Sequence, residues 1–476
     1  MPPEERYRDG AGTERCLSRM PSSKRFLGKL CVAAWLAALC ALGASEAMAA
    51  RRVIYDAETH TIIHALAAPL LKAADLDPAG VDIVVIVDPD INAFVAGGPY
   101  IFINTGLILA AKNVGQVMGV LAHEIGHLRS GDVLRTRAAA AGASKAAVLS
   151  MILGAAAIAA GQGEAGAALL HGGRASATGA FLAFSRGQEA AADQAALDLL
   201  AKTGQSPRGL CDFMALLAGQ EALLDTDRDT YARTHPHSRD RLATIERALA
   251  TAPARDAPPP PHLAAGFARL RAKLTAYLQS STTVRRRYPA SNQSFAARYA
   301  RAIAAHRAHQ TADAVAALDG LIAGTPKDTF LLATRGAFQL DSGDAAGAEA
   351  SYRAALRLAG ALPETARAIL TRDLAAALLA GNSAIKDREA RDLLRPIAPW
   401  ASDSPGYWRQ RAIAHGRLGE VGAATLAHGE AALRRGRLKE AHDLAARARR
   451  QLTVGTPEHL RALDIENAAR NQLETR

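Results

Sequence analysis

The segment His123-Glu124-Ile125-Gly126-His127 sets the strictest condition on the fold of this chain. Four steps of about 100° along an α-helix bring the direction back to within about 40°, so both imidazoles project from one helix face. They can then share one metal ion at the ~2.0–2.1 Å that zinc requires. Glu124 lies one step round the helix, where it can take a proton from water and return it to a leaving amine. Apolar residues on both sides indicate a buried helix rather than a loop.

Glu189 is the best candidate for a third metal ligand. It shares a helix face with Asp193, four residues further on in an amphipathic segment that opens at residue 185. Glu189 can complete a three-ligand site with an open fourth position, and Asp193 can accept the spare N–H of a ligating histidine. Two acidic residues at this spacing usually mark a solvated face. The three alanines 190–192 between them indicate close helix packing instead.

His235 is a further candidate for the catalytic site. A lone histidine is ordinarily a capping or surface residue, but Pro236 holds His235 in an extended conformation that suits a side chain aimed into a cleft. Two roles stay open at this point. His235 can stabilise the oxyanion of a transition state, or it can act as a ligand that keeps water from the metal.

The order of these motifs resembles that of the HtpX-like and CAAX-prenyl-endopeptidase zinc metalloproteases, the gluzincins. The resemblance covers about residues 53–250. It rests on the segment 123–127, on Glu189 and Asp193 after Ser185-Arg186, on Thr234-His235-Pro236 with Arg241, and on the residues 92–107 that precede the metal helix.

This resemblance implies one zinc ion per chain and a fold with a small sheet among helices. It implies that His123, His127 and Glu189 are the zinc ligands and that Glu124 is the catalytic base. It also implies an edge strand that pairs with an extended substrate, formed by Tyr100, Ile101, Phe102 and Ile103.

The N-terminal segment has the pattern of a secretory signal peptide. Lys24, Arg25 and Lys29 precede an apolar run over 30–42, and Ala47-Met48-Ala49 offers a small-residue cleavage site. The run is too short for a comfortable membrane span. We expect residues 1–49 to be a signal with extra residues ahead of a start at Met20. A retained N-terminal anchor is the alternative, and its flanks fit less well.

Hydrophobic periodicity divides the remaining chain into two parts. Strands are predicted at 81–87 and 100–103, and helices at 56–74 and 114–128. The proline-rich stretch 251–262 cannot continue a helix and is interpreted as a stiff linker. We therefore predict an α+β, mostly helical chain: a metalloprotease domain over 50–250, then an all-α domain over 263–476.

One apolar segment, 146–160, fits no single interpretation. It is shorter than the ~20 residues that a spanning helix needs. A helix packed over the candidate site, or one that dips into a membrane surface, fits this length better than a span.

The C-terminal part resembles the tetratricopeptide repeat family. Small and aromatic residues recur at that consensus spacing, and small residues let paired helices approach closely. About four repeats are indicated, on these positions: Ala314, Leu318, Pro326, Gly336, Ala348, Tyr352, Ala355, Trp408, Ala412, Gly419, Ala424, Ala431, Ala441, Ala445 and Ala448. An unrelated alanine-rich helical domain is the alternative.

Charge is distributed unevenly between these parts. Residues 50–262 carry 18 basic and 21 acidic groups, whereas residues 263–476 carry 32 and 20. The basic excess has little aromatic interleaving and follows an export signal, which argues against nucleic acid as a partner. Acidic protein segments or anionic lipid heads suit it better, and a merely solvated arginine-rich face is the alternative.

An exported zinc protease with such repeats resembles the Gram-negative envelope proteases that act in outer-membrane protein biogenesis. This resemblance implies a periplasmic location and cleavage of misfolded or stalled outer-membrane proteins. The repeats would dock these substrates or the barrel assembly machinery, with peripheral membrane contact as a further option. The alternative is a chaperone or docking module in which proteolysis is minor and gated.

Overall fold

The computed structural model describes residues 52–96, 98–132, 185–221, 235 and 239–474. The described residues cluster as one compact unit. Three predicted features lie outside the described residues: the signal peptide 1–49, the apolar segment 146–160, and the residues on either side of His235. No helix within the described ranges is long and apolar enough to cross a membrane.

A four-stranded sheet of order β1-β2-β4-β3 lies at the centre of the N-terminal part. Its strands are β1 (Arg52–Val53), β2 (Asp82–Val87), β3 (Ala93–Val95) and β4 (Tyr100–Asn104). The neighbours β2 and β4 run parallel, with Ile83 opposite Ile101. Their inward side chains are buried, as expected for a strand run rich in β-branched residues. The strands predicted at 81–87 and 100–103 are thereby confirmed.

The prediction that Tyr100, Ile101, Phe102 and Ile103 form an edge strand is wrong. β4 lies between two other strands, because the three-residue strand β3 pairs antiparallel along its outer side. The β-branched and aromatic residues of 100–103 indicate a strand, but they carry no information on which neighbours it has. A strand as short as β3 gives no periodic signal of its own. The edge on this side of the sheet is Ala93–Val95.

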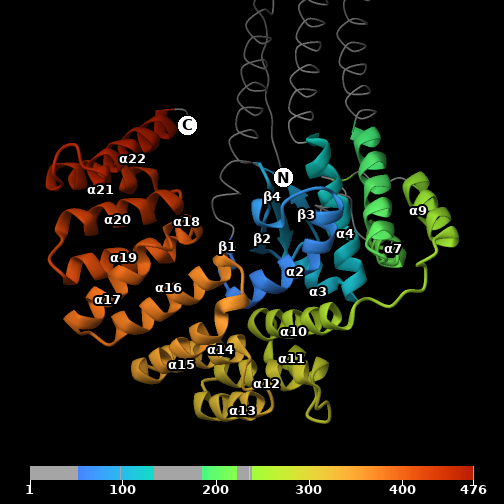
Figure 1. Ribbon diagram of the computed structural model, residues 1–476, viewed down its shortest axis with the longest axis horizontal. Helices are drawn as coiled ribbons and strands as arrows, with labels where there is room; N and C mark the ends of the chain where they lie inside the picture. Colours follow the sequence, from blue (N-terminus) through green and yellow to red (C-terminus); the bar gives the residue numbers. More distant parts are fainter. Residues whose placement is uncertain (1–51, 97, 133–184, 222–234, 236–238, 475–476) are drawn as a thin grey trace, which may run out of the picture. The chain divides into compact units, whose positions relative to one another are not determined.

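Helices cover the sheet (Figure 1). Those of the N-terminal part are α2 (Ala57–Ala73), α3 (Thr105–Ala110), α4 (Val114–Ser130), α7 (Arg208–Glu221) and α9 (Arg239–Thr251), with a 3-10 turn η1 (Pro78–Gly80). Residues 185–202 are also helical. The helices predicted at 56–74 and 114–128 correspond to α2 and α4 and are confirmed. Asp56 caps α2 by accepting the Thr59 N–H, and Gly131 ends α4 in the left-handed conformation.

Close contact between α4 and the helix 185–202 depends on small residues. A Cβ added to Gly126 would lie 3.1 Å from the carbonyl oxygen of Ala192 and 3.1 Å from the Cβ of Ala195. These distances are too short for an ordinary side-chain contact, so glycine at 126 lets the two helices approach. The alanines of the second helix complete the contact. The two helices that carry the candidate ligands are therefore held against each other.

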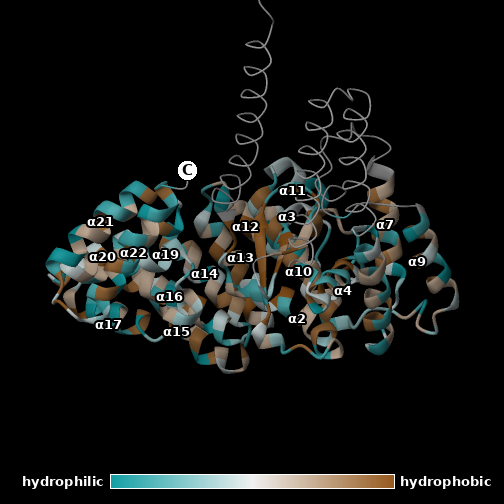
Figure 2. Ribbon diagram, turned by 90° about the horizontal axis from the view of Figure 1, so that it is seen from above, coloured by the Kyte–Doolittle hydropathy of each residue, from teal (hydrophilic) through white to brown (hydrophobic). Residues whose placement is uncertain are grey.

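Helices alone make up the described C-terminal part. They are α10 (Pro261–Leu278), α11 (Ser281–Arg287), α12 (Phe295–Arg307), α13 (Thr311–Gly324), α14 (Thr329–Asp341), α15 (Ala345–Leu358), η2 (Ala359–Ala361), α16 (Glu364–Ala380), α17 (Ala384–Leu394), α18 (Ala398–Ala401), α19 (Pro405–Arg417), α20 (Val421–Arg434), α21 (Leu438–Gln451) and α22 (Pro457–Glu474). Consecutive helices pack as hairpins, such as α12 with α13, α14 with α15, and α19 with α20. Alternating brown and teal bands along these helices in Figure 2 reflect their amphipathic sequences.

Small residues let these hairpins close. Ala314, Ala348 and Ala441 are fully buried between helices. Gly336 of α14 lies against Tyr352 of α15, where an added Cβ would be 3.1 Å from the ring. This packing is the kind that the repeat interpretation requires, because each helix pair buries its apolar face against its neighbour.

The two parts of the chain share packing and charged contacts. Leu263 and Phe267 of α10 belong to the same hydrophobic core as α2 and the sheet. Both residues follow the proline-rich stretch 251–262. At the start of α2, the buried carboxylate of Glu58 accepts hydrogen bonds from Lys273 at 2.9 Å and from Tyr299 at 2.8 Å. It also pairs with Arg269. The domain boundary stays a prediction, and α10 packs into the core of the part that precedes it.

Candidate metal centre

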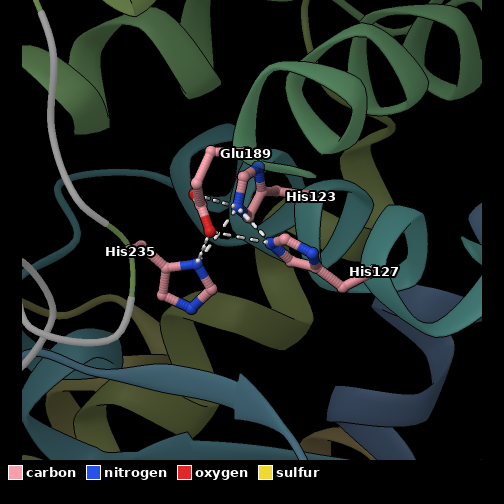
Figure 3. A group of neighbouring side chains, drawn as sticks. All are labelled: His123, His127, Glu189 and His235. Atoms are coloured by element: carbon pink, nitrogen blue, oxygen red, sulfur yellow. Dashed lines mark hydrogen bonds and ion pairs between the residues drawn. The ribbon is translucent and has the colours of Figure 1, made fainter. Parts of the chain in front are cut away.

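Four buried side chains that are distant in sequence converge on one point. His123, His127, Glu189 and His235 each offer a ligand atom, and these atoms all lie within 4.8 Å of one another (Figure 3). The two histidines of the first motif come from α4, Glu189 comes from the helix 185–202, and His235 comes from the segment before α9. The structure thus brings together the four side chains that the motifs single out.

The distances within the group suit a shared metal ion. The Nε2 atoms of His123 and His127 lie 3.1 Å apart. The Glu189 carboxylate faces both, with Oε1 3.3 Å from His127 Nε2 and Oε2 3.4 Å from His123 Nε2. Tetrahedral ligands at about 2.0–2.1 Å from an ion are separated from each other by a little over 3 Å. Two imidazoles and a carboxylate are a donor set that zinc and related divalent ions accept.

A second layer of carboxylates orients the two imidazoles. Asp193 Oδ1 lies 3.0 Å from His123 Nδ1, as predicted for the partner of a ligating histidine. Asp132 stands in the same relation to the second imidazole, with its Oδ2 atom 2.9 Å from His127 Nδ1. Both contacts direct the Nε2 lone pairs at the common point. The sequence reasoning missed Asp132, and the one available signal was its position just after Gly131, where α4 ends.

Arg241 joins the second layer to the first. Its guanidinium donates to both oxygens of Asp193, at 2.6 and 2.8 Å, and its Nη1 lies 2.8 Å from Glu189 Oε2. All three side chains are buried. A bidentate arginine–carboxylate pair is geometrically specific, so Arg241 fixes the position of Asp193 and, through it, of His123.

Burial and hydrogen bonding shift the pKa values of these groups in opposite directions. Burial alone would lower the pKa of His127, but hydrogen bonds with Asp132 and Glu189 outweigh it and raise the pKa above its ordinary value. Burial likewise opposes ionisation of Glu189, whereas the three histidines lower its pKa far more than burial raises it. Glu189 is therefore a carboxylate at neutral pH. A metal ion would replace the shared protons, because ligating imidazoles are neutral.

His235 and Glu124 complete the group. His235 Nδ1 lies 3.0 Å from Glu189 Oε1 and 3.4 Å from His123 Nε2. Its Nε2 lies 3.3 Å from the Ala93 carbonyl oxygen of β3 and 3.4 Å from Glu124 Oε1. Glu124 is fully buried, and its two oxygens have no hydrogen-bond partner among the described residues. A buried carboxylate with free acceptor capacity beside an N/O donor cluster fits a site that holds a metal ion and a water.

The sheet reaches this group through β3 rather than through β4. Ala93, the first residue of β3, contacts His235, and α4 packs against the same strand. One strand further in lies β4, with Tyr100, Ile101, Phe102 and Ile103.

Cys211 is buried on α7 and is a free cysteine.

Comparison with known proteins agrees with this geometry. Residues 55–249 match the model of peptidase family M48, which indicates a metallopeptidase. A Vibrio cholerae protein provisionally named beta-barrel assembly-enhancing protease is 29% identical over 220 residues, 46% of this chain and 44% of that protein. The beta-barrel assembly-enhancing protease of Yersinia pestis is 26% identical over 193 residues, 40% of this chain and 39% of its own length.

The likeness to a third relative extends into the C-terminal helices. The beta-barrel assembly-enhancing protease of Escherichia coli K12 is 26% identical over 381 residues, which is 79% of this chain and 76% of the relative. The resemblance inferred from the motifs is thus confirmed: this chain carries a domain that matches peptidase family M48, and the chain is similar to beta-barrel assembly-enhancing proteases.

Proposed function

We propose that this protein is a zinc-dependent metalloendopeptidase. The observation that carries the proposal is the buried convergence of His123, His127 and Glu189, beside a carboxylate of Glu124 that accepts no hydrogen bond from the described residues. Zinc held by these three ligands would lower the pKa of water and polarise the peptide carbonyl. The family match supports metallopeptidase chemistry, and zinc is the finer proposal.

Within this site each side chain has a separate task. Glu124 takes the proton of the attacking water and gives it to the leaving amine, since its oxygens accept no hydrogen bond from the described residues. The carboxylates of Asp193 and Asp132 lie at the Nδ1 atoms of the two imidazoles, so the Nε2 atom of each ring is left to the metal ion and the orientation of the rings is fixed. Arg241 holds Asp193 in place.

For His235 we propose a gating role. Its Nδ1 lies as close to Glu189 and His123 as a fourth ligand would, so in this conformation it occupies the side of the group where water and substrate must enter. The residue has to turn away before cleavage. After that movement it can still donate to the developing oxyanion, which is the other role that the sequence leaves open.

The edge strand β3 is the proposed place for the substrate backbone. An extended peptide can add to a sheet edge through main-chain hydrogen bonds, and β3 (Ala93–Val95) is the edge next to His235 and α4. This assignment replaces the one made for 100–103.

Glu124→Gln is the decisive test. It keeps the size of the side chain and removes the base, so we expect zinc to bind at one ion per chain while the cleavage rate falls by about 10²–10⁴-fold. The measurement is hydrolysis of a denatured β-barrel protein by the purified full chain, with zinc content determined on the same sample. Glu246→Gln, at an exposed position on α9, is the matched control. Undiminished cleavage by a zinc-loaded Glu124→Gln variant would sink the mechanism.

We propose that the substrates are misfolded or stalled outer-membrane proteins and that the protein works in the periplasm. The names of the relatives support the first point, and the signal-like segment over 1–49 supports the second. The C-terminal helices, interpreted as tetratricopeptide repeats, would dock substrates or the assembly machinery through their basic charge. If docking is as strong at high salt as at low salt, this electrostatic role is wrong.

A docking or chaperone function is the second candidate. It is favoured by the basic excess of residues 263–476, which carry 32 basic and 20 acidic groups. Peptide cleavage does not require this excess. If the Glu124→Gln variant still supports assembly of a β-barrel protein in cells, docking is separable from cleavage. If it does not, the peptidase activity carries the function. A scaffold without peptidase activity predicts that the purified chain holds no stoichiometric zinc.

A further inference from the structure

A second pair of histidines with the same spacing lies on α2. His60 and His64 are four residues apart, and their rings stack with centroids 4.1 Å apart. Asp82, the first residue of β2, lies beside them, and the three side chains offer ligand atoms within 4.8 Å of one another. These residues belong to none of the motifs that identify the candidate peptidase site.

We propose that His60, His64 and Asp82 form a second binding site for a divalent transition-metal ion such as Zn²⁺. Two imidazoles with one carboxylate are a donor set that zinc accepts. Histidines at i and i+4 present their nitrogens from one helix face, and the first strand residue after a short connection supplies the carboxylate. The site rests on its own residues and does not depend on the peptidase activity.

The hydrogen bonding of the two rings leaves donor atoms for a metal. The Nδ1 atom of His60 is buried and has no hydrogen-bond partner among the described residues. His64 Nε2 lies 3.3 Å from the backbone nitrogen of Ile83, so its lone pair points at the start of β2, next to Asp82. At 3.3 Å this hydrogen bond is long, and a metal ion can displace it.

Both imidazoles are neutral at physiological pH, as metal ligation requires. Burial lowers the pKa of His60 to about 4. Burial and the neighbouring His60 lower the pKa of His64 to about 3.

A further carboxylate faces the site from the C-terminal helices. Asp403, between α18 and α19, lines a cavity of about 160 Å³ together with His60 and Asp82. Burial and the charge of Asp403 raise the pKa of Asp82. Among the described residues neither carboxylate forms an ion pair. Arg372 lines the same cavity, but its guanidinium donates to Asp373 and to the Tyr55 carbonyl.

The position of Asp403 links the proposed metal site to the packing of the C-terminal helices. The Tyr55 hydroxyl donates to the Asp403 carbonyl at 3.0 Å, which holds this loop near the beginning of α2. A cation at the site would offset the repulsion between Asp82 and Asp403. Metal binding would therefore strengthen the contact between the sheet and the C-terminal helices.

The test counts metal sites on the full chain. The protein is stripped with a chelator and titrated with Zn²⁺ by calorimetry, and we expect two sites. His123→Gln/His127→Gln should remove one of them and His60→Gln/His64→Gln the other, whereas His428→Gln, at an exposed position on α20, should retain both. A His60→Gln/His64→Gln variant that still binds as many ions as the unmodified protein would overturn the proposal. So would a single site that disappears with His123 and His127.

Two single substitutions keep the test decisive if the double variant does not fold. Asp82→Asn should raise the dissociation constant of the second site at least about tenfold, because a charged ligand is lost. Asp403→Asn should raise it by a smaller factor. An unchanged constant in Asp82→Asn excludes the site. An unchanged constant in Asp403→Asn excludes the contribution of the C-terminal helices.

Discussion

Two histidine pairs with identical spacing have different surroundings in this molecule. On α4, His123 and His127 are 1% and 7% exposed, and their rings meet at 87°. Each has a carboxylate at its Nδ1 atom. On α2, His60 and His64 are only partly buried, and their rings stack at 25° with no hydrogen-bonded carboxylate among the described residues. Helical spacing brings two imidazoles to one face, but the carboxylates of Asp132, just after α4, and of Asp193, on another helix, decide how the rings turn.

The largest effect that separates the pairs is expected from His127→Ala. This change removes a ligand from the candidate peptidase site, so cleavage should fall at least as far as with Glu124→Gln, by about 10²–10⁴-fold. The checks are the rate on a denatured β-barrel protein and the zinc content, both of which should fall. His262→Ala, at an exposed position on α10, should change neither. Retained cleavage in His127→Ala would show that the buried pair is not the site of chemistry.

The next effect concerns the carboxylates that distinguish the first pair. Asp193→Asn keeps the shape of the side chain but weakens its ion-pair contact with His123 and its hydrogen bonds with Arg241. We expect zinc affinity to fall about 10–100-fold, measured by competition with a chelating dye. Asp198→Asn lies on the same helix at an exposed position and is the control. Equal affinities in the two variants would mean that the orienting carboxylate has no role.

A smaller effect is expected from the packing beneath the first pair. Gly126→Ala places a methyl group 3.1 Å from Ala192 and Ala195, and such overpacking costs about 1–3 kcal/mol. Urea denaturation of the full chain measures it. Gly187→Ala on the facing helix meets no atom of the described residues within 4 Å and should not destabilise, since alanine favours helix. If Gly126→Ala is as stable as the unmodified protein, the close approach of the helices is unimportant.

The smallest effect is the pH dependence that the second pair confers. The pKa values of His60 and His64 in the folded state are about 4 and about 3, below the ordinary histidine value of 6.5. The unfolded chain therefore binds protons first as the pH falls below about 6.5, and the folded state loses stability from there downward. With chelator present, the free energy of unfolding should fall by on the order of 1 kcal/mol between pH 7 and pH 6.

Replacing both histidines of the second pair should flatten that dependence. His60→Gln/His64→Gln has no imidazole to protonate on α2, whereas the exposed His428→Gln control should keep the slope of the unmodified protein. Chemical denaturation at several pH values measures both. An equally steep slope in the double variant would assign the pH dependence to other groups.

Much of the local structure was predictable. The elements α2, α4, β2 and β4 have strong apolar periodicity or long β-branched runs, and each lies within a residue or two of its predicted range. The strand β3 was not predictable, because three residues carry no period. Its presence moves the sheet edge from β4 to Ala93–Val95. The error over Tyr100–Ile103 concerns pairing between strands, and pairing depends on residues far away in the chain.

The candidate site shows the same division. His123, His127, Glu189 and His235 could be selected by motif and spacing, and the structure brings them together. Asp132 and the double pairing of Arg241 could not be selected. An aspartate after a helix end and an arginine on a polar helix are ordinary residues, and only their neighbours in space give them a function.

By itself the sequence determined which helices form and which residue types a metal could use, because helical spacing and side-chain chemistry are local properties. The tertiary structure decided the rest. It placed β3 at the edge, turned the imidazoles of α4 with Asp132 and Asp193, and brought Asp403 to the cavity beside His60 and Asp82. These contacts join segments separated by up to several hundred residues. They arise only when buried groups must find partners in the folded chain.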